Sequence, residues 1–179
     1  MLLDDRPLRA LNTDLKAWVS IGVDEALTGL EESLQNMDDE QLASFPMPGC
    51  NNIAWITMHL LQNFDQYAVL FQRGTSAVDN AKFWVINTPP AASDTAYPGR
   101  REIFETLQPV RTAAVDAVDL ATNEALLGKR HAPEEWPGNA LDAYVRAIYH
   151  TQSHLRQIWA LRGMMRLNCK DTMPHQLWA

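Results

Sequence analysis

Residues 140–165, ALDAYVRAIYHTQSHLRQIWALRGMM, carry the pattern that decides the fold. Small and apolar residues recur at helical spacing along one face, which holds Ala143, Ala147 and Leu161. A second apolar stripe follows the opposite face and consists of Leu141, Val145, Ile148, Leu155 and Trp159. A helix that is apolar on two faces is buried on two sides. We expect one face to meet a helical bundle and the other to meet a partner subunit or a long loop, which favours a homodimer.

Three further stretches have the same periodicity. Apolar residues recur every three or four positions over residues 11–36, 52–73 and 100–126. Asn51 and Asn52 offer N-cap side chains for the second of these helices, and Gly74 ends it. No stretch alternates with a period of two, so strands are not expected. The sequence therefore predicts one all-α domain over residues 1–179, an up-and-down four-helix bundle with helices at 11–36, 52–73, 100–126 and 140–166.

One proline and one long connection modify this outline. Pro109 falls inside the third helix and removes one backbone donor, so we expect a kink there. The connection over residues 75–99 is rich in Pro, Ser and Ala but also carries Phe83 and Trp84. We expect this segment to pack against the bundle, and long connections of this kind are often functional.

Composition excludes several classes of protein. The 179 residues include 15 Lys and Arg against 22 Asp and Glu, a net charge of −7, and the basic residues do not cluster. An acidic chain without a basic stripe repels phosphate backbones, so nucleic-acid binding is not expected. No apolar run approaches the roughly 20 residues that a membrane span needs. The first ten residues, MLLDDRPLRA, are charged where a signal peptide would be apolar, so we expect a cytoplasmic protein.

The two cysteines do not define a site. Cys50 and Cys169 lie far apart in no CxxC pair, so neither a disulfide scaffold nor a cysteine-rich zinc site is indicated. Our interpretation of Cys50 is a buried, inert thiol, because no basic residue adjoins it.

Histidine is the informative residue type. His150 and His154 are four apart in the last helix, so their side chains lie one turn apart on one face and can share a metal ion. Coincidence among five histidines is the alternative. His59 lies midway along the second helix, where a single histidine is usually a core residue. Next to the pair it would complete a set of three imidazoles, which leaves coordination positions open for water or substrate.

Polar neighbours on the same helices are candidates for holding the rings of these histidines. They are Asn63, Gln66 and Gln157. His131 and His175 are expected to be solvated. HTQSH lacks the glutamate of HExxH, and the sequence contains no Glu-x-x-His, GxGxxG, GxxxxGK[ST] or GxSxG motif.

The order of these residues resembles the DinB/YfiT-like superfamily. The similarity rests on one histidine within NNIAWITMHLLQN, on His-x3-His in the last helix, and on the Gln157 and LRG (161–163) that follow. The resemblance implies a four-helix bundle, commonly dimeric, that binds a divalent metal such as zinc or nickel through His59, His150 and His154. It also implies a thiol-dependent transferase or isomerase, in which the metal lowers the pKa of a low-molecular-weight thiol.

Three hypotheses follow. In the first, the protein is a metalloenzyme that acts on a small molecule through an activated thiol or, as a hydrolase, an activated water. Arg146 or Arg156 would then bind an anionic substrate, and Asp65 is the nearest carboxylate for a general base. In the second, it is a non-catalytic dimeric metal-binding bundle that acts as a sensor or interaction domain. In the third, the histidines are ordinary core residues without metal.

Overall fold

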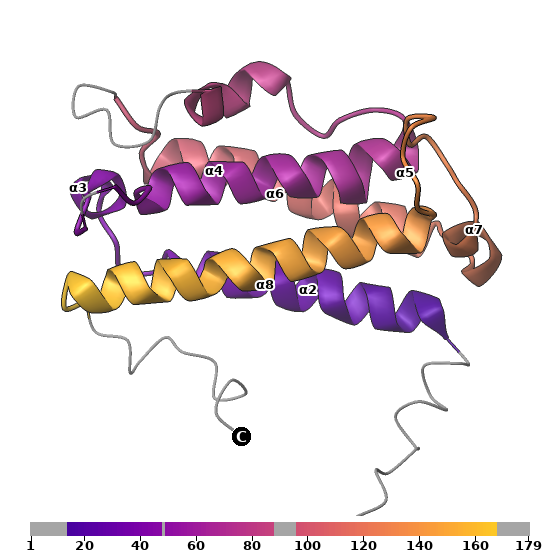
Figure 1. Ribbon diagram of the computed structural model, residues 1–179, viewed down its shortest axis with the longest axis horizontal. Coiled ribbons are helices and arrows are strands. Elements are labelled where there is room, and N and C mark those ends of the chain that lie inside the picture. The colour runs from indigo at the N-terminus through magenta and orange to yellow at the C-terminus, as the bar shows by residue number, and fades with distance from the viewer. Residues whose placement is uncertain (1–13, 48, 88–95, 168–179) are drawn as a thin grey trace, which may run out of the picture.

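The computed structural model describes residues 14–47, 49–87 and 96–167, and every regular element within them is helical (Figure 1). The elements are α2 (Leu15–Ser33), α3 (Asp39–Ala43), α4 (Ile53–Phe64), η1 (Asp65–Leu70), α5 (Phe71–Arg73), η2 (Asn80–Asn87), α6 (Arg100–Asp119), α7 (Asn123–Leu127) and α8 (Ala140–Met164). The all-α prediction is confirmed. None of these helices is both long enough and apolar enough to cross a bilayer.

Capping residues explain where the two helices with the candidate histidines begin. The Asn52 side chain accepts a hydrogen bond from the Trp55 N–H at 2.8 Å, which starts α4. Asn139 and Asp142 form a reciprocal capping box at the start of α8, with bonds of 2.9 and 2.8 Å. Gly74 ends the second helical segment in a left-handed conformation, with φ at 80°. These caps fix where each helix begins, and hence the position of each histidine along its helix axis.

The first and last expected helices differ from the structure only at their ends, since α2 ends at Ser33 and α8 at Met164, but the second and third differ in more than that. The second one is continuous through α4, η1 and α5, but η1 is a π-helical stretch that the periodicity did not indicate. The third one was expected to reach residue 126, yet α6 ends at Asp119 and α7 begins after Thr122. The Thr122 side chain accepts the Ala125 N–H at 3.1 Å, so it caps a new helix instead of continuing the old one. α6 runs unbroken through Pro109, and the kink there stays a prediction.

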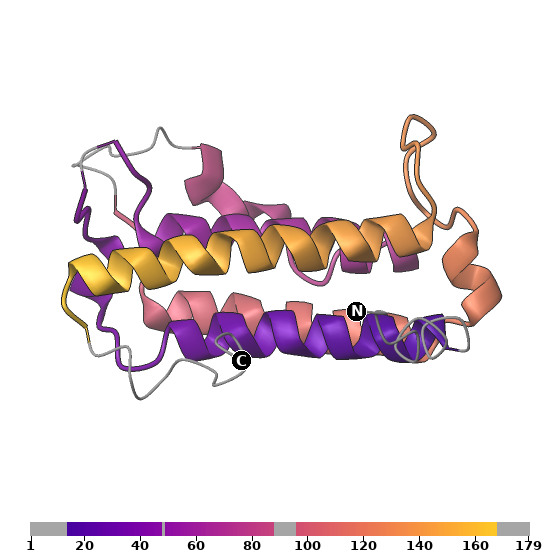
Figure 2. The ribbon, with the colours of Figure 1, turned by 60° about the horizontal axis from the view of Figure 1, so that its bottom comes forward.

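The four long helical segments lie side by side, and each contacts two of the others (Figure 2). α2 packs against α8 and α6, and the α4–η1–α5 segment packs against the same two helices. α2 and α8 run in the same direction, because Arg162 near the end of α8 donates to the carbonyl of Ser33 at the end of α2. α2 and α6 run in opposite directions, because Lys16 at the start of α2 donates to the carbonyl of Asp119 at the end of α6.

The directions of the four helical segments differ from the expected up-and-down arrangement. α4 and α8 are antiparallel, since Gln72 beyond α4 donates to the carbonyl of Ala140 at the start of α8. It follows that α4 and α6 are parallel. The physical reason is the connection after α5, which runs back along the molecule before α6 begins, with η2 packed on α4 (Figure 1).

That connection packs as the sequence indicated. Phe83 and Val85 of η2 are buried in the core, whereas the Trp84 side chain is 39% exposed. The carboxylate of Asp65, itself 2% exposed, accepts the Ala77 N–H at 2.6 Å and so fixes the start of the connection to η1. Residues 88–95 lie outside the described part of the chain.

Candidate metal centre

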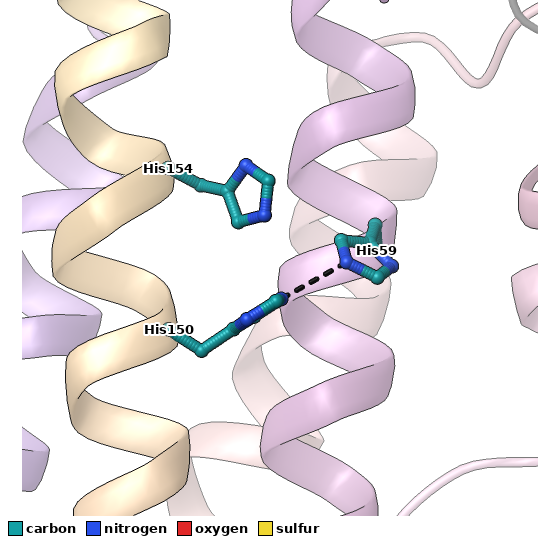
Figure 3. A group of neighbouring side chains, drawn as sticks. All are labelled: His59, His150 and His154. Atoms are coloured by element: carbon teal, nitrogen blue, oxygen red, sulfur yellow. Dashed lines mark hydrogen bonds between the residues drawn. The ribbon is translucent and has the colours of Figure 1, made fainter.

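The structure brings His59, His150 and His154 together between α4 and α8 (Figure 3). One ring nitrogen from each lies within 4.8 Å of the others. The antiparallel contact of the two helices places His59 opposite the pair, and the one-turn separation of the pair puts both of its rings on the facing side. No further His, Cys, Asp or Glu joins this cluster within the described residues.

The distances within the triad suit a metal ion. The Nε2 atoms of His150 and His59 are 2.9 Å apart. Two imidazoles on one ion, with metal–nitrogen bonds of about 2.0–2.1 Å, have their nitrogens about 3 Å apart when the angle at the ion is close to a right angle. The Nδ1 atom of His154 lies 2.8 Å from Oε1 of Gln157, which leaves Nε2 of His154 as the nitrogen available to an ion. Three neutral imidazole nitrogens converging on one point are a donor set that zinc and nickel accept.

The ring of His59 is held by stacking. The Trp55 ring lies on it with a centroid distance of 5.1 Å and an interplanar angle of 22°. The Nδ1 atom of His59 is buried and has no hydrogen-bond partner among the described residues. Such an orphaned nitrogen carries a desolvation cost whether or not Nε2 of the same ring holds an ion. Trp55 and this orphaned atom were not anticipated, although the four-residue spacing from Trp55 to His59 is visible in the sequence.

Electrostatics favour the neutral rings that bind metal. Burial, followed by the neighbouring His150 and His154, lowers the pKa of His59 to about 4. Burial also lowers the pKa of His150, with smaller contributions from His154 and Arg146. Neutral imidazole is the form that binds metal, so at neutral pH His59 and His150 are in the protonation state that a cation needs.

The polar residues expected to hold the rings have different roles. Gln157 bonds to the ring of His154. The Asn63 side chain instead donates to the main-chain carbonyl of His59, at 3.1 Å. Gln66 lines a small cavity of about 230 Å³ together with Gln62, Leu70, Ser76 and Asn80. Of the three candidates, Gln157 is therefore the one whose ring contact is present in the described structure.

Other residues singled out in the sequence lie as follows. Asp65 is engaged with the Ala77 N–H, and burial raises the pKa of its carboxyl. Arg146 lies over the Tyr67 ring, and Arg156 is exposed on another side of α8. His131 is exposed, as expected, and its backbone N–H donates to the carbonyl of Phe71. Cys50 is half-buried, and His175 and Cys169 lie outside the described residues.

The lowered pKa of His59 predicts how metal-free protein responds to acid. In the unfolded chain this histidine binds a proton below about pH 6.5, whereas the folded protein resists protonation until about pH 4. The unfolded state therefore binds more protons in this window, and stability falls as the pH is lowered from 6.5 towards 4. Thermal unfolding of chelator-treated protein at several pH values measures the effect. His59→Gln should flatten the dependence, and equal slopes for the two proteins would contradict this explanation.

The comparisons with known proteins bear on the family and the fold. A family model described as the DinB superfamily matches residues 23–158. A solved structure, the conserved protein of a locus from Enterococcus faecalis, superposes with a TM-score of 0.68 at 15% sequence identity. The superposition covers 87% of this chain and 99% of that one, and it shows a shared fold. A comparison with curated proteins gives no match.

Proposed function

The chain belongs to the DinB superfamily, and from this premise we propose that it is a divalent-metal-dependent enzyme whose ion is held by His59, His150 and His154. The observation that carries the proposal is the convergence of three ring nitrogens from two helices. Zinc and nickel are the proposed ions, because both accept imidazole nitrogen. Bound there, the ion supplies Lewis acidity, which lowers the pKa of a coordinated thiol or water.

The protein's own residues have separable roles in this proposal. Gln157 fixes the orientation of His154 and keeps its Nε2 atom directed away from the bonded side. Trp55 covers one face of His59 and excludes water from it. Ser76 and Asn80 of the long connection line a cavity with Gln62, Gln66 and Leu70, and none of the three histidines lines it, so this cavity is separate from the triad.

Transfer of a small thiol is the reaction that we favour over hydrolysis. A hydrolase has to protonate its leaving group, which calls for a general acid or base beside the ion even when the metal has lowered the pKa of the attacking water. Within the described residues no carboxylate joins the triad, and Asp65 is occupied with the Ala77 N–H. A thiol needs no separate base once its pKa has been lowered. We therefore propose a thiol-dependent S-transferase or isomerase acting on a small molecule.

The alternative is a metal-binding bundle without catalysis, serving as a sensor or interaction domain. A structural metal is normally closed by a fourth protein ligand. The described residues offer no fourth His, Cys, Asp or Glu at the triad. This favours the enzyme over the structural site.

We also propose that the protein is a homodimer through the face formed by α2 and α8. These helices contact one another, and exposed apolar side chains occur on both: Ile21 is 59% exposed and Tyr149 is 69% exposed. Apolar side chains exposed on two adjacent helices favour association. A second copy of the chain is the proposed occupant.

Thiol transfer tests the function. Untagged protein is loaded with zinc or nickel, and cysteine, glutathione or cysteamine is offered with 1-chloro-2,4-dinitrobenzene. In this reaction the thiol sulfur forms a bond to the ring carbon, and chloride and the thiol proton leave. We expect at least one thiol to react about 100-fold faster with wild type than with His154→Ala. Gln66→Ala, which leaves the triad intact, is the matched control.

Elemental analysis of the same samples separates the two hypotheses. Metal in wild type without acceleration of any thiol would refute the transferase and favour the non-catalytic bundle. Absence of metal after loading would refute the metal site itself.

A further inference from the structure

Arg146 lies on the triad side of α8. It precedes His150 by four residues, so its side chain projects one helical turn from that ligand along the same face. Its guanidinium carbon lies 5.0 Å from the centroid of the Tyr67 ring. Tyr67 belongs to η1, the continuation of α4 beyond His59. Arg146 and the triad therefore bridge the same pair of helical segments, one turn apart.

Tyr67, whose ring lies against Arg146, is itself packed between other aromatic rings. Its ring meets Phe71 at a centroid distance of 5.2 Å and Trp136 at 5.4 Å. Trp136 lies in the loop before α8, and with the two other rings it forms a cluster of three aromatic residues. A guanidinium stacked on a packed ring loses little further conformational freedom when it binds a ligand.

The charge of Arg146 is not neutralised by a carboxylate of the described residues. Asp142, one turn earlier on α8, accepts the N–H of Asn139 in the capping box. Asp65 on η1 is bonded to the N–H of Ala77. The ion pairs of the described structure involve Arg101 and Arg111, on α6.

We propose that Arg146 binds a carboxylate of the substrate while the reacting part of that substrate lies at the triad. Stacking covers a face of the guanidinium and leaves its edge to donate two parallel N–H bonds, which is the geometry that suits a carboxylate. One helical turn corresponds to about 5.4 Å, so the substrate is a small organic acid whose reacting end lies a few bonds from its carboxylate. This inference rests on the proposed function and names the substrate class for the same site.

The test measures binding rather than turnover. Succinate, glutarate and adipate are titrated into zinc-loaded protein by calorimetry, with butyrate as the single-carboxylate probe. We expect at least one dicarboxylate to bind wild type more tightly than butyrate does. Arg146→Met should weaken that binding about ten-fold or more, since a charge-assisted bidentate contact is lost. Arg156→Met, on an exposed side of α8, is the matched control and should leave binding unchanged.

Zinc content and circular dichroism are measured on each sample. Equal dicarboxylate affinity in wild type and Arg146→Met, both fully loaded and folded, would overturn this inference and leave the metal site standing. A loaded wild type that binds none of the acids would also overturn it. A wild type that takes up no zinc would refute the proposed function, and this inference with it.

Discussion

Replacing Arg162 by alanine is expected to lower the free energy of unfolding by about 3 kcal/mol or more. The side chain is 1% exposed, and one of its guanidinium nitrogens donates to the carbonyls of Ser33 and Gln35 at 2.9 and 3.0 Å. These carbonyls lie at the end of α2, where the helix provides no donors of its own. The guanidinium also lies 5.2 Å from the centroid of the Trp159 ring. Alanine would leave a cavity and remove these bonds together.

Urea unfolding followed by circular dichroism measures this loss. Arg101→Ala is the matched control, because the Arg101 side chain is 92% exposed and pairs with Glu105 one turn later. An exposed pair of this kind contributes about 0.5 kcal/mol or less. Equal destabilisation of the two variants would contradict the role of Arg162 in joining the end of α8 to the end of α2 by hydrogen bonds.

Removal of His59 has the largest expected effect on metal binding. His59→Ala should weaken zinc affinity at least about 1000-fold, because a three-nitrogen site becomes a two-nitrogen site formed by one helix. α4 then contributes no ligand, so the packing of α4 against α8 no longer brings ligands from two helices together. Competition with a chromophoric chelator measures the affinity.

Two further variants sharpen this measurement. Gln157→Ala should lower the zinc affinity about 10- to 100-fold, since the side chain that orients the His154 ring is removed while that ring stays. Gln66→Ala should bind zinc as wild type does, because Gln66 lies in the separate cavity with Ser76 and Asn80. Equal zinc affinity of His59→Ala and Gln66→Ala would contradict the triad.

The His150–His154 pair could be predicted because its determinant, the spacing of the two residues along one helix, is local. Four-residue spacing in a helix places His150 and His154 on one face, whatever the rest of the chain does. The place of His59 needed one more fact, that its helix lies beside α8, and the order of helices in the related family supplied it. The bond from His154 to Gln157 follows from the same spacing rule.

The parts that failed depend on information that periodicity does not contain. A hydrophobic stripe shows which residues face the core, but it does not show in which direction a long connection leads the chain, so the parallel pairing of α4 with α6 was missed. Asn63 was expected at a ring, yet its amide reaches the carbonyl four residues earlier, a local bond that competes with any distant partner. Thr122 was overlooked as a cap within an apparently continuous helix.

The most direct test of the metal centre is anomalous diffraction from crystals of the zinc-loaded protein. We expect one strong peak at the zinc edge between α4 and α8, within about 2.0–2.1 Å of a ring nitrogen of each of His59, His150 and His154. We also expect no fourth protein side chain to reach the ion. A peak bound to other residues, or a triad whose rings hold no zinc in loaded crystals, would contradict this expectation.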